Sequence, residues 1–305
     1  MSGTSDPLPS AVQRFVATVA RRDLRLEGLH VHRRGREPVS HRWSRDERRD
    51  VFSVSKTFTS VAIGLARGEG RLDLDDPVLG HLPDLADTAA DGAHTMTVRH
   101  LLSMRAGNEL RWDYPDMDWP GDPARAFLAA PLLAPPGTRY AYRGMVSYVL
   151  GRVLHAVSGS DLRDYLMPRL FDPLGIANPQ WHRCPLGFPM AAVGLHLRTE
   201  EMSRLGQVLL DDGVHRGRQL VPADFVTLMR TLTTPTGRDH PDNARYGLHC
   251  WPCSRDDAWR MDGIRGQFVV MLPRHDACLA VTADFDGPTT DILDAIWEDL
   301  VPALG

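Results

Sequence analysis

The chain has 305 residues, of which 43% are hydrophobic and 24% charged, the composition of an ordinary globular protein. Its formal net charge of −4 gives no electrostatic reason to bind nucleic acid or an anionic membrane. No apolar run approaches the roughly 18 residues of a membrane span, and the N-terminus lacks the basic and apolar regions of a signal peptide. We therefore expect a cytoplasmic protein of one large domain or two interleaved ones, with neither nucleic acid nor membrane as a partner.

The first part of the chain predicts a helix, two strands and a buried helix. Apolar residues recur at helical spacing over 8–22, and alternation predicts a strand over 24–32 with a bulge or bend at Gly28. A second strand can return over 37–43. Residues 53–68 are apolar on most sides of a helix, which is typical of a helix at the centre of a core.

The middle of the chain is predicted to be helical. From about 71 to 195 helical periods alternate with Pro/Gly loops, and helices are expected near 97–103, 144–157 and 159–171. Two more helices are expected from Thr199 to about 211 and from Pro222 onward.

The end of the chain returns to strands. Short strand patterns over 258–262, 266–273 and 277–284 precede an amphipathic helix over 289–302. Strands at both chain ends predict an α+β fold, with an antiparallel sheet formed by both ends, flanked by helices, and an inserted, mostly helical subdomain. We expect residues 1–70 and 196–305 to form one discontinuous α/β domain, residues 71–195 to form the helical subdomain, and an active site to lie between them.

A Ser-x-x-Lys motif opens the predicted central helix. Lys56 is the one lysine among 35 basic residues, so its position needs a property that arginine lacks, such as loss of a proton near neutral pH. Three residues apart on a helix, Ser53 and Lys56 share a face. Apolar neighbours should lower the pKa of the lysine, so that its neutral amine can take the proton of the serine. An ordinary Ser and Lys at a helix start is the alternative, because short motifs often occur by chance.

Two further regions are candidates for the same site. Tyr142 lies in a loop just before a predicted helix, where nearby amines should lower the pKa of its phenol and let it shuttle a proton; a packing tyrosine is the alternative. The aromatic, acidic and proline-rich segment 108–123 suits a loop that lines or covers a pocket, or else a solvated surface loop. Its candidate substrate-binding residues are Trp112, Tyr114 and Trp119.

The cysteines are not expected to be functional. Cys250-Trp-Pro-Cys253 has the spacing of a redox or zinc half-site, but the sequence offers no second ligand pair at zinc spacing. Reduced, buried thiols are the better interpretation, and no metal or cofactor is expected.

Taken together, these motifs resemble the serine β-lactamase/penicillin-binding-protein superfamily, in its class C β-lactamase-like branch. Phe52-Ser-Val-Ser-Lys-Thr matches the nucleophile motif of that superfamily. The resemblance extends along nearly the whole chain through segments 70–77, 97–107 and 136–151. Asp262-Gly263 falls where the family has Lys-Thr-Gly or His-x-Gly.

Two departures from the family pattern narrow the resemblance. Gly144 replaces the asparagine that follows the family tyrosine, and Met261 replaces the cation expected to meet a penicillin carboxylate. In both positions the chain resembles the esterases and 6-aminohexanoate-dimer hydrolases of the branch, which also lack these residues. The strand segment Gly263-Ile-Arg-Gly-Gln267 is similar to one in the same enzymes. The resemblance therefore implies a serine hydrolase that acts on small-molecule esters or amides.

The expected mechanism uses neutral Lys56, assisted by Tyr142, to deprotonate Ser53, with Tyr142 passing the proton to the leaving group. The backbone N–H groups of Ser53 and Ile264 should stabilise the oxyanion, and Gly263 should let substrate approach the strand. Gly144 is the remaining candidate substrate-binding residue. Two alternatives stay open: an acyltransferase of secondary metabolism with the same site, and a binding module that has lost catalysis.

Overall fold

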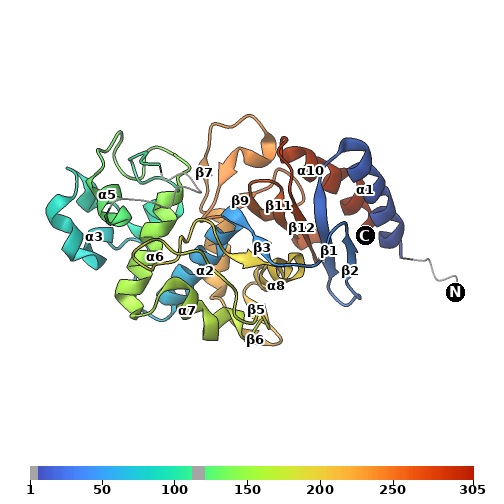
Figure 1. Cartoon of the computed structure of the whole chain (residues 1–305), viewed down its shortest axis with the longest axis horizontal. Coiled ribbons are helices and arrows are strands. Elements are labelled where there is room, and N and C mark those ends of the chain that lie inside the picture. The colour runs from blue at the N-terminus through green and yellow to red at the C-terminus, as the bar shows by residue number, and fades with distance from the viewer. Residues whose placement is uncertain (1–5, 112–120) are drawn as a thin grey trace.

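One antiparallel sheet joins the two ends of the chain, in a computed structural model that describes residues 6–111 and 121–305. The strand order is β2-β1-β12-β11-β10-β9, so that β1 (Leu26–Arg33) lies beside β12 (Ala277–Ala283). Figure 1 shows this as blue and red strands side by side. The remaining strands of the sheet are β2 (Val39–Arg42), β9 (Trp251–Pro252), β10 (Trp259–Gly263) and β11 (Gln267–Leu272). The predicted sheet from both chain ends is confirmed.

The bulge expected at Gly28 is present. The register between β1 and β12 shifts between Leu26 and Gly28. A side chain at Gly28 would meet Thr199 and Arg42 at 2.4–2.5 Å, so the strand needs a glycine here to let helix and strand approach closely.

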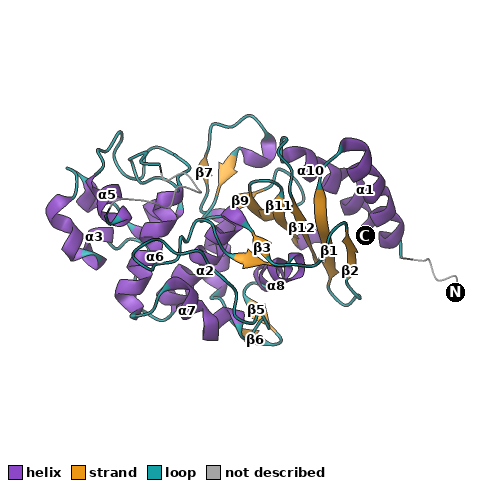
Figure 2. Cartoon of the chain, viewed as in Figure 1, coloured by secondary structure: helices purple, strands orange, loops and turns teal. Residues whose placement is uncertain are grey.

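Helices cover both faces of the sheet (Figure 2). On one face, α1 (Leu8–Arg22) packs with the C-terminal helical segment, which consists of α10 (Thr290–Ala295) and a π-helical turn over Ile296–Leu300. On the other face, α8 (Thr199–Leu210) packs against β1, β11 and β12. Both faces of the central strands are therefore buried, which explains why β11 and β12 read as continuous apolar runs.

The middle of the chain forms the helical part of the molecule, at the left in Figure 1. Its α-helices are α3 (Val78–His81), α4 (Val98–Leu102), α5 (Pro123–Ala129), α6 (Gly144–Ser158) and α7 (Leu162–Leu166). The α+β fold with an inserted helical region is confirmed, and its division at residues 70/71 and 195/196 stays a prediction. The helix expected over 159–171 is shorter, because Pro168 cannot donate a backbone hydrogen bond and a π-helical turn over Met167–Phe171 follows α7.

The short strands lie outside the six-stranded sheet. They form three two-stranded pairs: β3 (Arg49–Asp50) with β4 (His196–Leu197), β5 (Val214–His215) with β6 (Arg218–Gln219), and β7 (Thr234–Pro235) with β8 (Arg245–Tyr246). The helix α9 (Ala223–Thr231) follows the expected start at Pro222.

The helix α2 (Ser55–Gly68) lies at the centre, between the sheet and the helical region, and its residues 55–66 are all buried. Its buried hydroxyl groups donate to backbone carbonyls of distant segments: Thr57 to His249 at 2.7 Å, Thr59 to Ala191 at 2.8 Å and Ser60 to Leu248 at 2.9 Å. Because each buried hydroxyl has a partner, these polar residues fasten the helix rather than destabilise the core. The first turn of α2 is thereby held rigidly.

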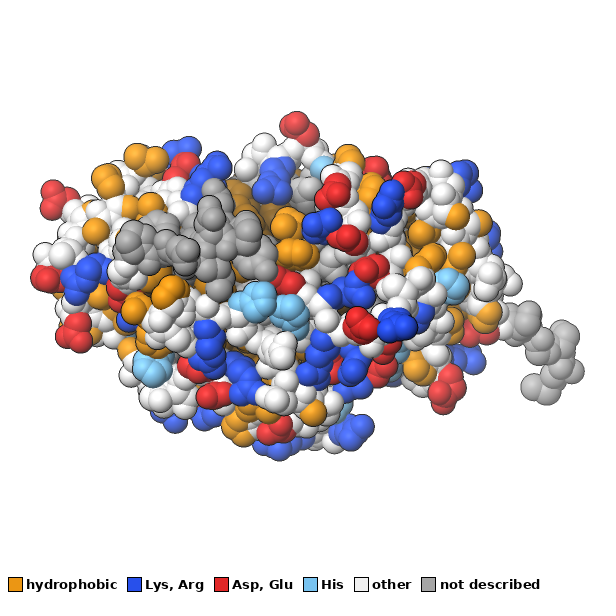
Figure 3. Space-filling model, viewed as in Figure 1, with side chains coloured by type: hydrophobic (Ala, Val, Ile, Leu, Met, Phe, Trp, Pro, Cys, Tyr) orange, Lys and Arg blue, Asp and Glu red, His pale blue; other side chains and the backbone are white. Residues whose placement is uncertain are grey.

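The surface carries charges of both signs, interspersed over the face in Figure 3. Within the described residues, no helix combines the length and the apolar character needed to cross a membrane.

Candidate active site

Ser53 lies in a 3-10 turn over Phe52–Val54 that leads directly into α2. Phe52 has a positive φ of 46°, which is unusual for a bulky residue and strains the turn. The backbone N–H of Phe52 donates to Asp50 Oδ1 at 2.7 Å, and Val54 N–H donates to the Val51 carbonyl at 3.1 Å. Hydrogen bonds thus hold the strained turn on both sides of Ser53, which lines a pocket.

Lys56 lies within hydrogen-bonding distance of Ser53, as the motif predicts. Its Nζ is 2.7 Å from Ser53 Oγ and 3.0 Å from the Ala192 carbonyl oxygen. Burial lowers the pKa of Lys56 from 10.5 to about 7, although the charges of Asp262 and Asp50 act in the opposite direction. The expected depression of the lysine pKa is confirmed, so a large fraction of this amine is neutral at pH 7.

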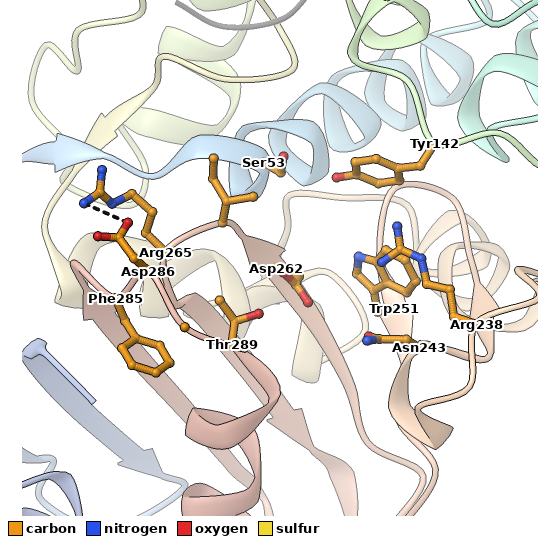
Figure 4. A pocket seen from close by; sticks show the side chains of 12 residues that line it. Ser53, Tyr142, Arg238, Asn243, Trp251, Asp262, Arg265, Phe285, Asp286 and Thr289 are labelled. Atoms are coloured by element: carbon orange, nitrogen blue, oxygen red, sulfur yellow. Dashed lines mark ion pairs between the residues drawn. The ribbon is translucent and has the colours of Figure 1, made fainter. Parts of the chain in front are cut away.

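Tyr142 occupies the loop just before α6, and Figure 4 shows its hydroxyl end pointing toward Ser53. Its ring packs edge-on against Tyr246 and lies with its centroid 5.0 Å from Lys56 Nζ. The expectation of a lowered pKa is wrong. Burial raises the pKa of Tyr142 well above its ordinary value, and the hydrogen bond with Ser53 offsets only part of that effect. The phenol is therefore neutral at pH 7 and suited to donate a proton rather than to accept one.

The pocket beside Ser53 has a volume of about 480 Å³. Of the predicted residues, Ser53, Tyr142 and Ile264 line it. Ile264 follows the last residue of β10 and is 58% exposed, which is unusual for a large apolar side chain. Ile264 thus lies at the pocket, and the role of its backbone N–H stays a prediction.

Several lining residues were not among the predicted site residues (Figure 4). Arg238 lies 5.1 Å from the ring centroid of Trp251 and 5.8 Å from that of Tyr142. Asp262 faces the pocket while its Oδ2 accepts from Arg260, which is buried, at 2.8 Å. The other residues added to the lining are Asn243, Arg265, Phe285, Asp286, Gly287 and Thr289.

The sequence held only weak signals for these residues. Trp251 lies within the Cys250–Cys253 segment, whose cysteine spacing is that of a redox or zinc half-site. Asp262 lies within the third motif of the family. Neither pattern by itself predicts that these side chains line the pocket. Arg238 lies in an ordinary polar loop, and nothing in its local pattern distinguishes it from the other arginines.

Gly263 lies where the backbone leaves no room for a side chain. It is buried, and a Cβ there would lie 2.5 Å from the Val51 carbonyl oxygen and 3.1 Å from Gln267 Cβ. The strand β10 therefore approaches the chain just before Ser53, and the predicted role of Gly263 toward substrate stays a prediction. Gly144 begins α6, where a Cβ would lie 3.3 Å from Ala192 Cβ, and it is not among the lining residues of this pocket.

Three of the candidate residues, Trp112, Tyr114 and Trp119, lie outside the described residues. Met261 is fully buried, so the third motif presents no cation from that position. The pocket has a guanidinium nonetheless, because Arg238 reaches it from another segment.

Cys250 is buried and its thiol donates to the Met229 carbonyl at 3.0 Å, and Cys253 is half-buried beside Arg260. Burial raises the pKa of the Cys253 thiol to about 11, so it stays protonated at neutral pH. These features favour ordinary packed thiols at both positions.

An α+β fold with a Ser–Lys pair at the start of a buried central helix defines the class of penicillin-binding-protein-like serine hydrolases. A family model described as Beta-lactamase matches residues 16–301, so the chain belongs to this family.

The relatives of this chain include a hydrolase and an esterase. The chain is 25% identical over 312 residues to the 6-aminohexanoate-dimer hydrolase of Paenarthrobacter ureafaciens, covering 93% of this chain and 77% of the relative. It is also 25% identical over 227 residues to the lovastatin esterase of Penicillium rubens, covering 61% of this chain and 55% of the relative. The chain is accordingly a serine hydrolase of the esterase and amidase type.

The fold has close counterparts among solved structures. A D-stereospecific amidohydrolase from Streptomyces sp. superposes with a TM-score of 0.73 at 21% identity, covering 94% of this chain and 98% of the other. This likeness establishes the fold, and the site chemistry has to be argued from the residues.

Proposed function

We propose that this enzyme hydrolyses small-molecule esters or amides through an acyl-enzyme on Ser53. The observation that carries the proposal is the 2.7 Å separation between Ser53 Oγ and Lys56 Nζ. Burial brings the pKa of that amine to about 7, so it can act as a general base at neutral pH.

In the first step, the neutral amine of Lys56 takes the proton from Ser53 as Oγ attacks the substrate carbonyl carbon. The resulting ammonium keeps the Ala192 carbonyl as a hydrogen-bond acceptor, so the new charge is not left unpaired. The carbonyl oxygen gains negative charge, and the backbone N–H groups of Ser53 and Ile264 are the proposed donors to it.

In the second step, Tyr142 donates its proton to the leaving alkoxide or amine and is reprotonated by the Lys56 ammonium. The high pKa of the buried phenol makes it a donor that stays protonated until the leaving group gains charge. Water then attacks the acyl-enzyme with Lys56 again as the base, which releases the acid and restores Ser53.

The pocket supports a substrate of mixed polarity. Its volume of about 480 Å³ lies within the range of small-molecule sites. The lining combines the aromatic face of Trp251, the carboxylate of Asp262 and the guanidinium of Arg238. We propose that Arg238 orients a carboxylate or carbonyl oxygen of the substrate and that the Trp251 ring packs on its apolar part. Gly144 and Met261, in place of the usual amide and cation, argue against efficient turnover of penicillins.

Activity of the Ser53→Ala variant on a panel of p-nitrophenyl esters tests the proposal. We expect a loss of kcat/KM of at least ~10³-fold, because removing the nucleophile leaves binding and oxyanion stabilisation alone. The matched control is Ser55→Ala, since Ser55 is buried next to the site, accepts from Leu195 N–H at 3.3 Å and does not line the pocket. Full activity in Ser53→Ala would refute the proposal.

Acyl transfer instead of hydrolysis would use the same first step. Product analysis with added amines and alcohols separates the two, since hydrolysis yields the free acid whatever acceptor is present. The cytoplasmic location stays a prediction that cell fractionation would test.

A further inference from the structure

We propose that Asp50, His182 and His196 form a binding site for one divalent transition-metal ion, with Zn²⁺ the best-suited ion. Each of these residues offers one ligand atom, and the three atoms lie within 4.8 Å of one another. Across the described parts of the chain, this is the one group of three or more such residues close enough to share an ion. The site is separate from the Ser53 pocket, whose lining includes none of the three residues.

The fold brings the three ligands together from distant segments. The strand β3 pairs with β4 so that Asp50 stands opposite His196. The segment around His182 runs alongside, with His182 N–H donating to the Gly194 carbonyl and Met190 N–H donating to the His182 carbonyl, both at 2.8 Å. All three backbones are therefore fixed by hydrogen bonds, which gives the site a preformed geometry.

The imidazole positions agree with metal ligation. The Nε2 atoms of His182 and His196 lie 3.0 Å apart. Two nitrogens each about 2.05 Å from one zinc ion, separated by that distance, subtend about 94° at the metal, which is within reach of a distorted tetrahedral or a facial arrangement. Without a metal, the same contact requires one ring to donate its proton to the other.

The carboxylate supplies a second, independent observation. Asp50 Oδ1 accepts from Phe52 N–H at 2.7 Å and from Gly194 N–H at 2.9 Å, which fixes the plane of the group. Its Oδ2 is buried and has no hydrogen-bond partner. An orphaned buried carboxylate oxygen is costly, and a metal ion shared with the two imidazoles would satisfy it.

The location gives the ion a positioning role. Asp50 holds the turn that carries Ser53, and the segment between His182 and His196 carries the Ala192 carbonyl that accepts from Lys56. An ion at this site would link the turn that carries Ser53 to the segment 182–196. It would lie outside the substrate pocket and would not contact substrate. All three side chains are partly exposed, so an ion can enter from solvent.

Titration of the chelator-treated, full-length enzyme with Zn²⁺ by isothermal calorimetry tests the site, with Co²⁺ absorption spectra as a second readout. We expect one equivalent to bind with a micromolar or tighter Kd, and the visible bands of Co²⁺ to report mixed nitrogen and oxygen ligands. His182→Ala and His196→Ala should each weaken binding at least ~10-fold to 100-fold.

Two controls locate the ion. His94→Ala removes an exposed histidine elsewhere, and Cys253→Ser removes the half-buried thiol, so both variants should bind Zn²⁺ as the wild type does. The proposal is overturned if the wild type binds Zn²⁺ no more tightly than millimolar. Binding that both histidine variants retain, or that Cys253→Ser abolishes, would also overturn it. Because the readout is metal binding, the result is independent of whether Ser53 proves to be the nucleophile.

Discussion

Replacement of Lys56 by arginine keeps a positive charge beside Ser53 but removes the possibility of a neutral base. Burial brings the pKa of Lys56 to about 7 from an ordinary value of 10.5, so about half of the amine is neutral at pH 7. An unperturbed lysine would be neutral in only about 0.03% of molecules at that pH, and arginine in far fewer. We therefore expect Lys56→Arg to lower kcat/KM by at least ~10³-fold.

The assay is stopped-flow hydrolysis of a p-nitrophenyl ester between pH 5 and 9. For the wild type, kcat/KM should rise with pH and level off above about 7, because the active form has lost the Lys56 proton and kcat/KM reports groups of the free enzyme. The variant should show no such inflection. Circular dichroism and a melting curve establish that the larger side chain is tolerated, since Lys56 is only 3% exposed. A folded Lys56→Arg enzyme with near-wild-type activity and the same pH profile would refute the role of Lys56 as base.

Three further outcomes are expected. Lys56→Met should be more stable than the wild type at low pH. The pKa of Lys56 is about 7 in the folded protein and 10.5 ordinarily, so between these pH values the unfolded chain binds more protons than the folded one. The free energy of unfolding of the wild type therefore rises with pH over this range. The advantage of the variant should shrink by roughly 3 kcal/mol between pH 6 and pH 9 in urea unfolding, and a pH-independent difference would contradict the buried-amine account. Tyr142→Phe should lose about 10²-fold or more in kcat/KM on alkyl esters but much less on p-nitrophenyl esters, whose leaving group needs no proton; an equal loss on both would argue against a proton donor. Gly263→Ala should lose about 10²-fold in activity because its Cβ would push on the Val51 carbonyl and displace the nucleophile turn, while Gly80→Ala, which meets no atom within 4 Å, serves as control.

The nucleophile could be predicted because its geometry is local. A spacing of three residues on a helix places Ser53 and Lys56 together whatever the rest of the chain does, and the scarcity of lysine indicates the special chemistry. The sheet could also be predicted, since β10, β11 and β12 carry strong apolar patterns. The shortened α7 shows where prediction from apolar periodicity fails. The apolar spacing continues through Pro168, but the α-helical hydrogen bonding of the backbone ends before it.

The rest of the site depends on distances through space. The direction of the Tyr142 pKa shift was predicted wrongly because the nearby charges were anticipated while the extent of burial was not, and burial has the larger effect. Arg238 reaches the pocket from a loop nearly 100 residues away from Tyr142 in the sequence, without a pattern that marks it. The pairing of Asp50 with His196 likewise follows from two-residue strands too short to predict from sequence.

The most direct test of the central claim is intact-protein mass spectrometry after reaction with a fluorophosphonate, followed by peptide mapping. We expect one adduct per chain, located on Ser53, and its absence in Ser53→Ala. The buried serine two residues further on provides the control, so Ser55→Ala should label like the wild type. An adduct on another residue, or an unlabelled but folded wild-type enzyme that still hydrolyses esters, would contradict the assignment of Ser53 as the nucleophile.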